Sequence, residues 1–248
     1  MAGELPRIKQ MALLDEAGVA LQKALDSEDA RAAEANYRKA ISAFETLIRS
    51  GIRNGKLYYN LGNVYFRLND LSRAIVNYRR ALRLMPGSSQ IRENLKYARS
   101  RVHDKIEMSG KRELVRSLFF WHFDTSLRSR TIAAIACYVL IWVLLIVAVF
   151  FRWHPLRWAM TAAIVLTVAL GVSCAADNYA HRHSLEGVIA AEEVTLRKGN
   201  GISYEPKYSE PLHSGTEFSV VEQRGNWYHI LLNNGKTGWI QATSAEII

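Results

Sequence analysis

The residues that come closest to a metal-binding motif in this sequence are His181 and His183, which are separated by one residue. Two imidazoles can bind zinc, but a zinc site needs a third or fourth ligand, and no cysteine array accompanies this pair. Cys137 and Cys174 lie singly in apolar runs, so they form neither a Cys-x-x-Cys motif nor a disulfide framework. We interpret the histidines as a solvated flank and expect no metal site and no cofactor.

Catalytic motifs are also missing from the sequence. We find no Gly-rich phosphate loop, no Ser/His/Asp arrangement and no paired-carboxylate motif. We therefore expect this chain to have no enzymatic activity. Residues 1–130 carry 24 Lys/Arg and 14 Asp/Glu, whereas residues 131–248 carry 8 and 9. A basic N-terminal half suits anionic lipid or an acidic partner. No nucleic-acid motif accompanies these charges, so nucleic acid is not an expected ligand.

Two long uncharged runs interrupt the chain. Residues 132–151 and 158–176 are 20 and 19 residues long, and a helix of that length spans a hydrocarbon core of ~30 Å. We predict a transmembrane helical hairpin over 132–176, with a linker at 177–186. A buried hairpin in a soluble core is the alternative, and the length of both runs argues against it. Small residues repeat every fourth position and predict the face on which the helices pack: Ala163, Thr167, Gly171 and Ala175.

The segment 107–131 precedes the hairpin. Its stretch LVRSLFFWHF (114–123) is aromatic and flanked by basic residues, which suits either an interfacial segment or a last repeat helix. Two spans place both flanking domains on one side of the membrane. Arg152 and Arg157 in the loop favour a cytoplasmic loop, whereas the basic flank before the first span favours the opposite orientation.

The first 18 residues lack the apolar core of a signal peptide. We therefore expect either a truncated start or repeats in the cytoplasm. The periplasmic side is the preferred location for both domains, and the cytoplasmic side is the alternative.

An internal period of 34 residues indicates helical repeats in 1–106. Residues 55–88 fit one tetratricopeptide unit, with matches at Tyr58, Leu61, Gly62, Tyr65, Ala74, Tyr78, Ala81 and Pro86. Counting back 34 residues from Ala74 and Tyr78 gives Ala40 and Phe44, the second helix of an earlier repeat. We place its first helix near 13–25 and a capping helix after Pro86, for about two and a half repeats in all.

Arrays of this kind bind extended peptides or helices in a concave groove made by their first helices. The residues that we expect to face this groove are Lys56, Tyr59, Asn63, Phe66, Arg67, Asn94 and Tyr97. Asn63 and Asn94 stand where clamp-type tetratricopeptide domains hold a ligand's C-terminal backbone. Tyr59 stands where those clamps have a lysine, which argues against a carboxylate clamp.

Alternating apolar and polar residues replace the helical pattern in 187–248. We predict strands at 194–199, 215–225, 226–235 and 236–241, with a hairpin at Asn234-Gly235. Short strands in about sixty residues favour a small closed barrel. This region resembles the bacterial SH3 family, on residues whose role we take to be mainly structural: Val194, Leu196, Arg197, Gly225, Trp227, Gly238 and Trp239. The resemblance implies binding of protein or cell-wall material.

Taken together, the chain resembles the E-type protein of the Bacteroides aerotolerance (Bat) operon. The resemblance rests on 57–63 (LYYNLGN), 119–122 (FFWH) and the order of repeat, hairpin and barrel, and it covers about 37–248. It implies an inner-membrane protein whose partners are von Willebrand A-type membrane proteins, with a MoxR-type AAA+ ATPase nearby, in stress or oxygen tolerance.

The sequence thus predicts a multidomain chain: an all-α repeat domain, a two-helix hairpin and an all-β SH3-like barrel. Two functions follow. One is a membrane-anchored scaffold that captures a partner protein in the repeat groove. The other is an envelope sensor whose barrel binds peptidoglycan.

Overall fold

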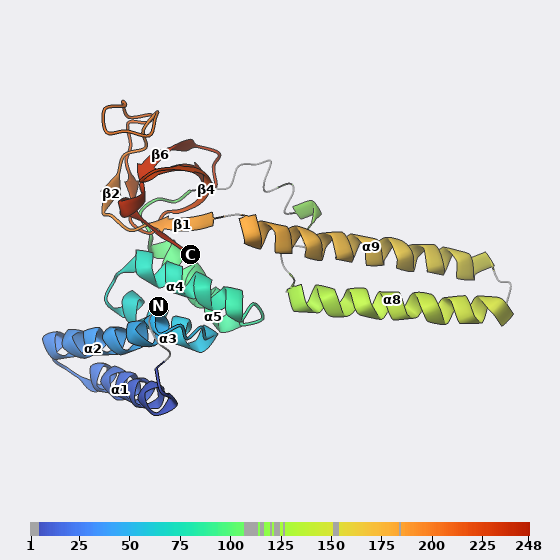
Figure 1. Ribbon diagram of the computed structural model, residues 1–248, viewed down its shortest axis with the longest axis horizontal. Helices are drawn as coiled ribbons and strands as arrows, with labels where there is room; N and C mark the ends of the chain where they lie inside the picture. The colour runs from blue at the N-terminus through green and yellow to red at the C-terminus, as the bar shows by residue number, and fades with distance from the viewer. Residues whose placement is uncertain are drawn as a thin grey trace. The chain divides into compact units, whose positions relative to one another are not determined.

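A computed structural model of the chain describes residues 5–106, 114, 117–119, 121, 125, 127–150, 154–183 and 185–248, with the backbone alone at 178–183. These residues fall into two compact units. Residues 1–107 and 185–248 bound the first unit, and 108–184 bound the second. The predicted fold class is confirmed: helical repeats, two apolar helices and an antiparallel sheet are all present (Figure 1).

Five helices form the repeat region: α1 (Arg7–Asp26), α2 (Ala30–Arg49), α3 (Gly55–Arg67), α4 (Leu71–Leu84) and α5 (Ser89–Arg101). Helices α1 and α2 pack as one pair, and α3 and α4 as the next. Polar residues define the helix starts, because the side chains of Asn54, Asp70 and Ser88 accept hydrogen bonds from the first free backbone N–H groups of α3, α4 and α5. Helix α1 begins earlier than the sequence indicated, at Arg7 instead of near 13.

The barrel has a five-stranded antiparallel sheet in the order β6-β5-β4-β1-β7 and a second small sheet of β2 and β3. Its strands are β1 (Leu185–Ile189), β2 (Glu193–Val194), β3 (Leu212–His213), β4 (Glu217–Arg224), β5 (Trp227–Leu232), β6 (Thr237–Gln241) and β7 (Ala245–Ile247), with a 3-10 helix η1 (Ala242–Ser244) before β7. The hairpin at Asn234-Gly235 joins β5 to β6 as predicted. Gly235 has φ +88°, a conformation that favours glycine.

Two details of the barrel differ from the sequence-based prediction. The first strand begins at Leu185, before the expected start at Gly187, and it was not predicted as a strand. The segment predicted as a strand at 194–199 is a strand only at its start, and Arg197 then makes isolated bridges to Pro206 and Trp239. The alternation there reflects buried Val194 and Leu196, not a continuous ladder.

The repeats and the barrel are joined by a network of arginines and glutamates within the first unit. Arg79, Arg80 and Arg83 lie on α4, and three barrel carboxylates face them. Arg79 pairs with Glu186 and Arg83 with the same carboxylate at 3.1 Å. Further ion pairs in this network join Arg79 to Glu217 at 3.4 Å, Arg80 to Glu246 at 2.9 Å and Arg99 to Glu217 at 2.5 Å.

Apolar contacts reinforce this docking. Val188 of β1 is fully buried in the core of the repeat region rather than in the barrel core. In the other direction, Ile106, which follows α5, packs against the barrel core. At Gly215 a Cβ would lie 2.7 Å from Val102, so the loop approaches the repeat as closely as it does because it carries glycine there. The repeats and the barrel therefore pack together as one unit, although the apolar helices separate them in the sequence.

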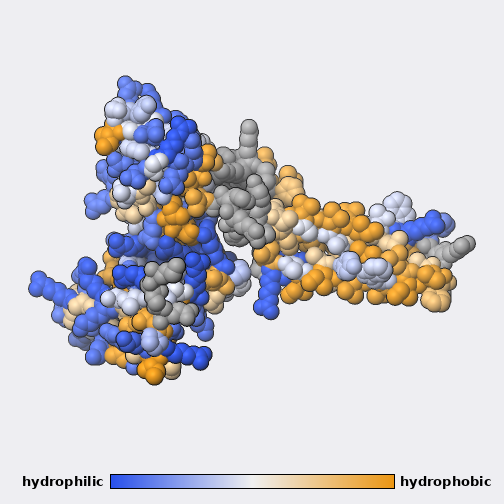
Figure 2. Space-filling model, in the orientation of Figure 1, coloured by the Kyte–Doolittle hydropathy of each residue, from blue (hydrophilic) through white to orange (hydrophobic). Residues whose placement is uncertain are grey.

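The second unit contains α8 (Leu127–Phe150) and α9 (His154–His183), which lie side by side as an antiparallel hairpin (Figure 1). Leu127–Phe150 and His154–Asp177 are long and apolar enough to cross a membrane. Few of their residues are buried, and Figure 2 shows apolar surface along both helices. A core helix of a soluble protein would be covered instead. Half of the aromatic segment 114–123 lies outside the described residues.

The contact face of the hairpin was predicted incorrectly in part. Ala163 is buried as expected, but Gly171 and Ala175 are exposed, while Leu170 and Ser173 are buried. Positions four residues apart drift by ~40° per step around an α-helix, whereas positions seven apart nearly coincide. A run of four-residue steps therefore turns away from the partner helix.

One charge of the expected basic flank is buried within the hairpin. Arg130 is 5% exposed and donates to Ser173 Oγ at 2.5 Å and to Asp177. Pairing lowers the cost of burying a charge. Arg130 therefore contributes less free positive charge to the basic flank of the first apolar helix than the sequence alone indicated.

The docking network predicts an acid-sensitive stability. Burial by itself raises the pKa of Glu186, but the charges and hydrogen bonds of Arg79 and Arg83 outweigh burial and lower that pKa below its ordinary 4.5. A lowered pKa stabilises the folded state above pH 4.5, and this stabilisation is lost as pH falls through the folded-state pKa. We expect Glu186→Gln to lower the thermal unfolding midpoint at pH 7 and to flatten its fall between about pH 5 and pH 3.

Thermal unfolding of the full chain followed by circular dichroism across this pH range checks the expectation. Glu93→Gln is the matched control, because Glu93 is exposed on α5 outside the docking network. If the unfolding midpoints of the wild type and Glu186→Gln changed equally with pH, the ionised Glu186 would not be a source of the stability of the first unit.

Candidate functional site

A cleft of about 440 Å³ lies in the repeat region between the first helices of successive pairs. Helices α1, α3 and α5 supply most of its lining, and one residue of α4 joins them. The lining residues are Leu21, Leu25, Tyr59, Asn63, Phe66, Arg67, Tyr78, Gln90, Asn94 and Tyr97. Six of the seven predicted groove residues therefore surround one cleft. Lys56 is the exception: it is exposed in the first turn of α3 and does not line the cleft.

The absence of a side chain at Gly62 determines how the cleft floor is built. A Cβ at Gly62 would lie 2.7 Å from the ring of Tyr78, so only glycine lets this ring lie directly against α3. Tyr78 is 1% exposed, and its hydroxyl donates to Asn63 Oδ1 at 2.8 Å. Burial, together with the neighbouring Tyr59, raises the pKa of Tyr78, so its hydroxyl remains protonated and a donor near neutral pH.

The two predicted asparagines are linked directly. Asn94 Nδ2 donates to Asn63 Oδ1 at 3.0 Å and to the hydroxyl of Tyr59 at 3.1 Å. With Tyr78, Asn63 Oδ1 thus accepts two hydrogen bonds. Among the described residues, no hydrogen bond uses Asn63 Nδ2 or Asn94 Oδ1. The network therefore presents one amide donor and one amide acceptor for a ligand.

Aromatic and basic side chains complete the cleft. The rings of Phe66 and Tyr97 lie 5.5 Å apart, and Tyr97 is 55% exposed. Arg67 lies exposed at the end of α3. Sequence reasoning missed the contributions of Leu21, Leu25, Tyr78 and Gln90 to this lining. In the sequence, Tyr78 is identified only as a match to the tetratricopeptide unit, and Leu21 and Leu25 lie within the helix expected near 13–25.

The barrel residues singled out in the sequence have structural positions. Leu196 is 1% exposed, and a Cβ at Gly238 would lie 2.8 Å from its side chain. Arg197 N and O exchange hydrogen bonds with Trp239 at 3.0 and 2.9 Å. Gly225 has φ +54° in the turn between β4 and β5, and Val194 is buried.

The two tryptophans of the barrel differ. Trp239 is 8% exposed, stacks on His229 with ring centroids 5.0 Å apart, and lies under Arg224 at 5.3 Å. Trp227 is half-buried at the start of β5. Neither forms an open aromatic platform with a neighbouring ring among the described residues.

Comparisons with known proteins agree with the repeat architecture. Residues 55–88, which include α3 and α4, match the family model of the tetratricopeptide repeat. This repeat is a non-enzymatic interaction module, so the match supports a role in binding protein partners.

The chain is also similar to the putative N-acetylmuramoyl-L-alanine amidase YrvJ of Bacillus subtilis (strain 168), with 33% identity over 55 residues. The match covers 22% of this chain and 10% of that protein. The similarity thus spans about a tenth of the relative's length, and it does not assign the relative's activity to this chain.

Proposed function

We propose that this chain is a membrane-anchored scaffold that captures a partner protein in the cleft of its repeats. The observation that carries the proposal is the hydrogen-bonded pair of Asn63 and Asn94 on the cleft floor. Asn63 Nδ2 can donate to a main-chain carbonyl, and Asn94 Oδ1 can accept from a main-chain N–H. This is the pair of groups that an extended peptide offers at each residue.

The chemistry of the cleft indicates the kind of peptide that fits. Phe66 and Tyr97 can pack against an apolar or aromatic side chain, and Arg67 favours acidic residues nearby. Tyr59 occupies the position where carboxylate clamps have a lysine, and its hydroxyl is engaged by Asn94. We therefore propose recognition of an internal extended segment or a helix rather than a free C-terminal carboxylate.

The docking of the barrel leaves this cleft open. Residues that contact the barrel, such as Arg79, Arg80 and Arg83, project from α4, while its Tyr78 faces the cleft. No residue of the docking network lines the cleft. The first unit can therefore use the cleft for one partner and the free barrel surface for another.

We propose that the two apolar helices anchor this unit in a bacterial inner membrane, with both domains in the periplasm. The order of repeat, hairpin and barrel supports membership in a Bat-type envelope complex. In that proposal, the partners are von Willebrand A-type membrane proteins, a MoxR-type ATPase acts nearby, and the role is aerotolerance or stress response. The division into 1–106, 107–131, 132–176, 177–186 and 187–248 belongs to the same proposal.

An envelope sensor is the second candidate function. The similarity to a putative N-acetylmuramoyl-L-alanine amidase favours this function, because the name of that protein indicates a cell-wall substrate. In this reading the barrel contacts peptidoglycan, and the repeats pass the signal to a partner.

The scaffold proposal predicts loss of one set of partners when the cleft changes. We expect Asn63→Ala combined with Arg67→Glu to reduce at least tenfold the recovery of partners cross-linked to the full chain in membranes, since about 1.4 kcal/mol corresponds to a tenfold change in affinity. Quantitative mass spectrometry of the captured proteins measures it. Lys39→Glu is the control, because Lys39 is exposed on α2 outside the cleft. Recovery of the same partners at the same yield from the cleft variant and from Lys39→Glu would show that the cleft does not bind them.

The sensor candidate predicts binding to the cell wall. Full-length chain in detergent should co-sediment with purified peptidoglycan sacculi and should still do so when the cleft carries Asn63→Ala and Arg67→Glu. A chain that stays in the supernatant at all sacculus concentrations excludes the sensor and leaves the scaffold unaffected.

A further inference from the structure

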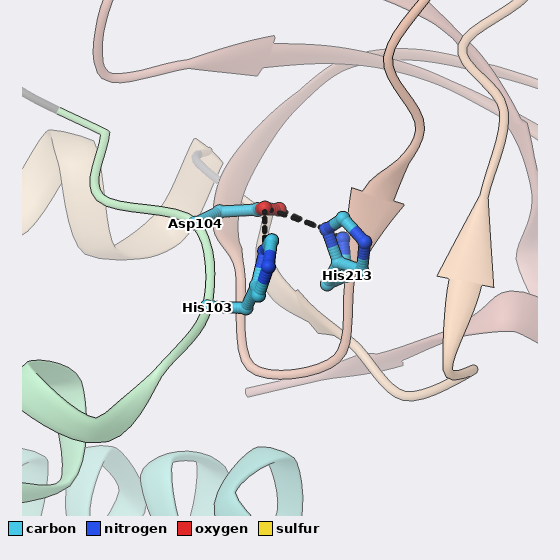
Figure 3. A group of neighbouring side chains, drawn as sticks. All are labelled: His103, Asp104 and His213. Carbon is cyan, nitrogen blue, oxygen red and sulfur yellow. Dashed lines mark hydrogen bonds and ion pairs between the residues drawn. The ribbon is translucent and has the colours of Figure 1, made fainter.

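A second polar cluster lies where the segment after α5 meets the barrel. Asp104 follows the last turn of α5, and its Oδ2 accepts from the backbone N–H of His213 at 2.7 Å and from Thr216 Oγ1 at 2.6 Å. Asp104 is 13% exposed. Two donors thus fix the carboxylate through one oxygen, and its other oxygen, Oδ1, is directed toward two imidazole rings (Figure 3).

The two imidazoles belong to His103 and His213. Asp104 Oδ1 lies 3.3 Å from His103 Nδ1 and 2.7 Å from His213 Nδ1. The ring centroids are 4.1 Å apart, and one ligand atom from each of the three residues lies within 4.8 Å of the others. Figure 3 shows His103 and Asp104 on the segment after α5 and His213 on the barrel.

This set of atoms suits a divalent transition metal. Zinc takes imidazole nitrogen and carboxylate oxygen at about 2.0–2.2 Å, so neighbouring ligands of a tetrahedral site lie roughly 3.3 Å apart. The His103–Asp104 separation already has this value. The His213–Asp104 separation is shorter by about 0.6 Å, so an entering ion would replace that hydrogen bond and open the pair slightly.

The surroundings support a site with His213 as a fixed ligand. The hydrogen bond at 2.7 Å between His213 Nδ1 and Asp104 Oδ1 fixes the ring with Nδ1 toward the cluster. The side chain of His213 is 26% exposed, whereas that of His103 is 74% exposed. One side of the cluster is thus fixed and the other is open to solvent, which provides a route of entry.

We propose that His103, Asp104 and His213 form a binding site for a divalent transition-metal ion of the zinc type, with a fourth position open to water. Two ligands come from the end of the repeat region and the third from the barrel. A bound ion therefore ties the repeats to the barrel at a point separate from the arginine–glutamate network. Metal supply then regulates how firmly the two domains of the first unit are joined.

Metal titration of the full chain tests this proposal. Protein in detergent micelles is stripped with a chelator and titrated with Co²⁺, whose visible absorption reports nitrogen and oxygen ligation, and then with competing Zn²⁺. We expect one ion per chain and at least about a tenfold weaker affinity in His103→Ala. Zn²⁺ should raise the thermal unfolding midpoint of the wild type, and this rise should be smaller in the variant.

His103→Ala is the decisive variant, because this side chain is 74% exposed and its removal leaves the buried core unchanged. The control is His181→Gln with His183→Gln, which removes the other histidine pair in the sequence and should leave the tight binding unchanged. Equal affinity in the wild type and His103→Ala, or loss of binding in the control, would overturn the proposal. So would the absence of saturable Co²⁺ binding to the wild type.

Discussion

The arrangement of the first unit depends on the attraction between arginines of α4 and α5 and carboxylates of the barrel. Arg79 and Arg80 are partly buried, and Arg83 and Arg99 are more exposed. The carboxylates that they face, Glu186, Glu217 and Glu246, are all partly buried. Exposed pairs contribute little singly, but a partly buried network with shared partners is screened less by water and salt. It is supported by Val188, which a barrel strand contributes to the repeat core. The network thus joins segments more than 100 residues apart into one unit.

This docking also explains why a short repeat array can support a binding surface. Helix α5 packs on α4 after the two helix pairs, and the barrel strands β1 and β7 cover a further part of α4. Tyr78 and Arg79 are adjacent on α4, yet one builds the cleft and the other holds the barrel. The cleft and the docking contact therefore use different faces of one helix, so a change on the docking face can leave the cleft in place.

Much of this fold could be predicted from the sequence because its patterns are local. The 34-residue period, the two uncharged runs and the Asn234-Gly235 turn each depend on nearby residues, and each is confirmed by the structure. The convergence of Asn63 and Asn94 was indicated by their positions on the first helices of successive pairs, where clamp-type domains have such residues. Contacts between distant segments carry no such signal. The docking of Glu186 on α4, the burial of Arg130 against Ser173 and Asp177, and the meeting of His103 with His213 depend on tertiary packing.

The arginines of α4 hold the barrel on the repeats while the cleft stays open. Hydrogen–deuterium exchange of the full chain in detergent tests this arrangement most directly, with the wild type compared with Arg79→Glu plus Arg83→Glu. We expect faster exchange at β1 and β7 in this variant, unchanged exchange at the cleft residues of α3, and partial restoration of protection when Glu186→Arg is added. Unchanged protection of β1 and β7 after charge reversal would contradict it.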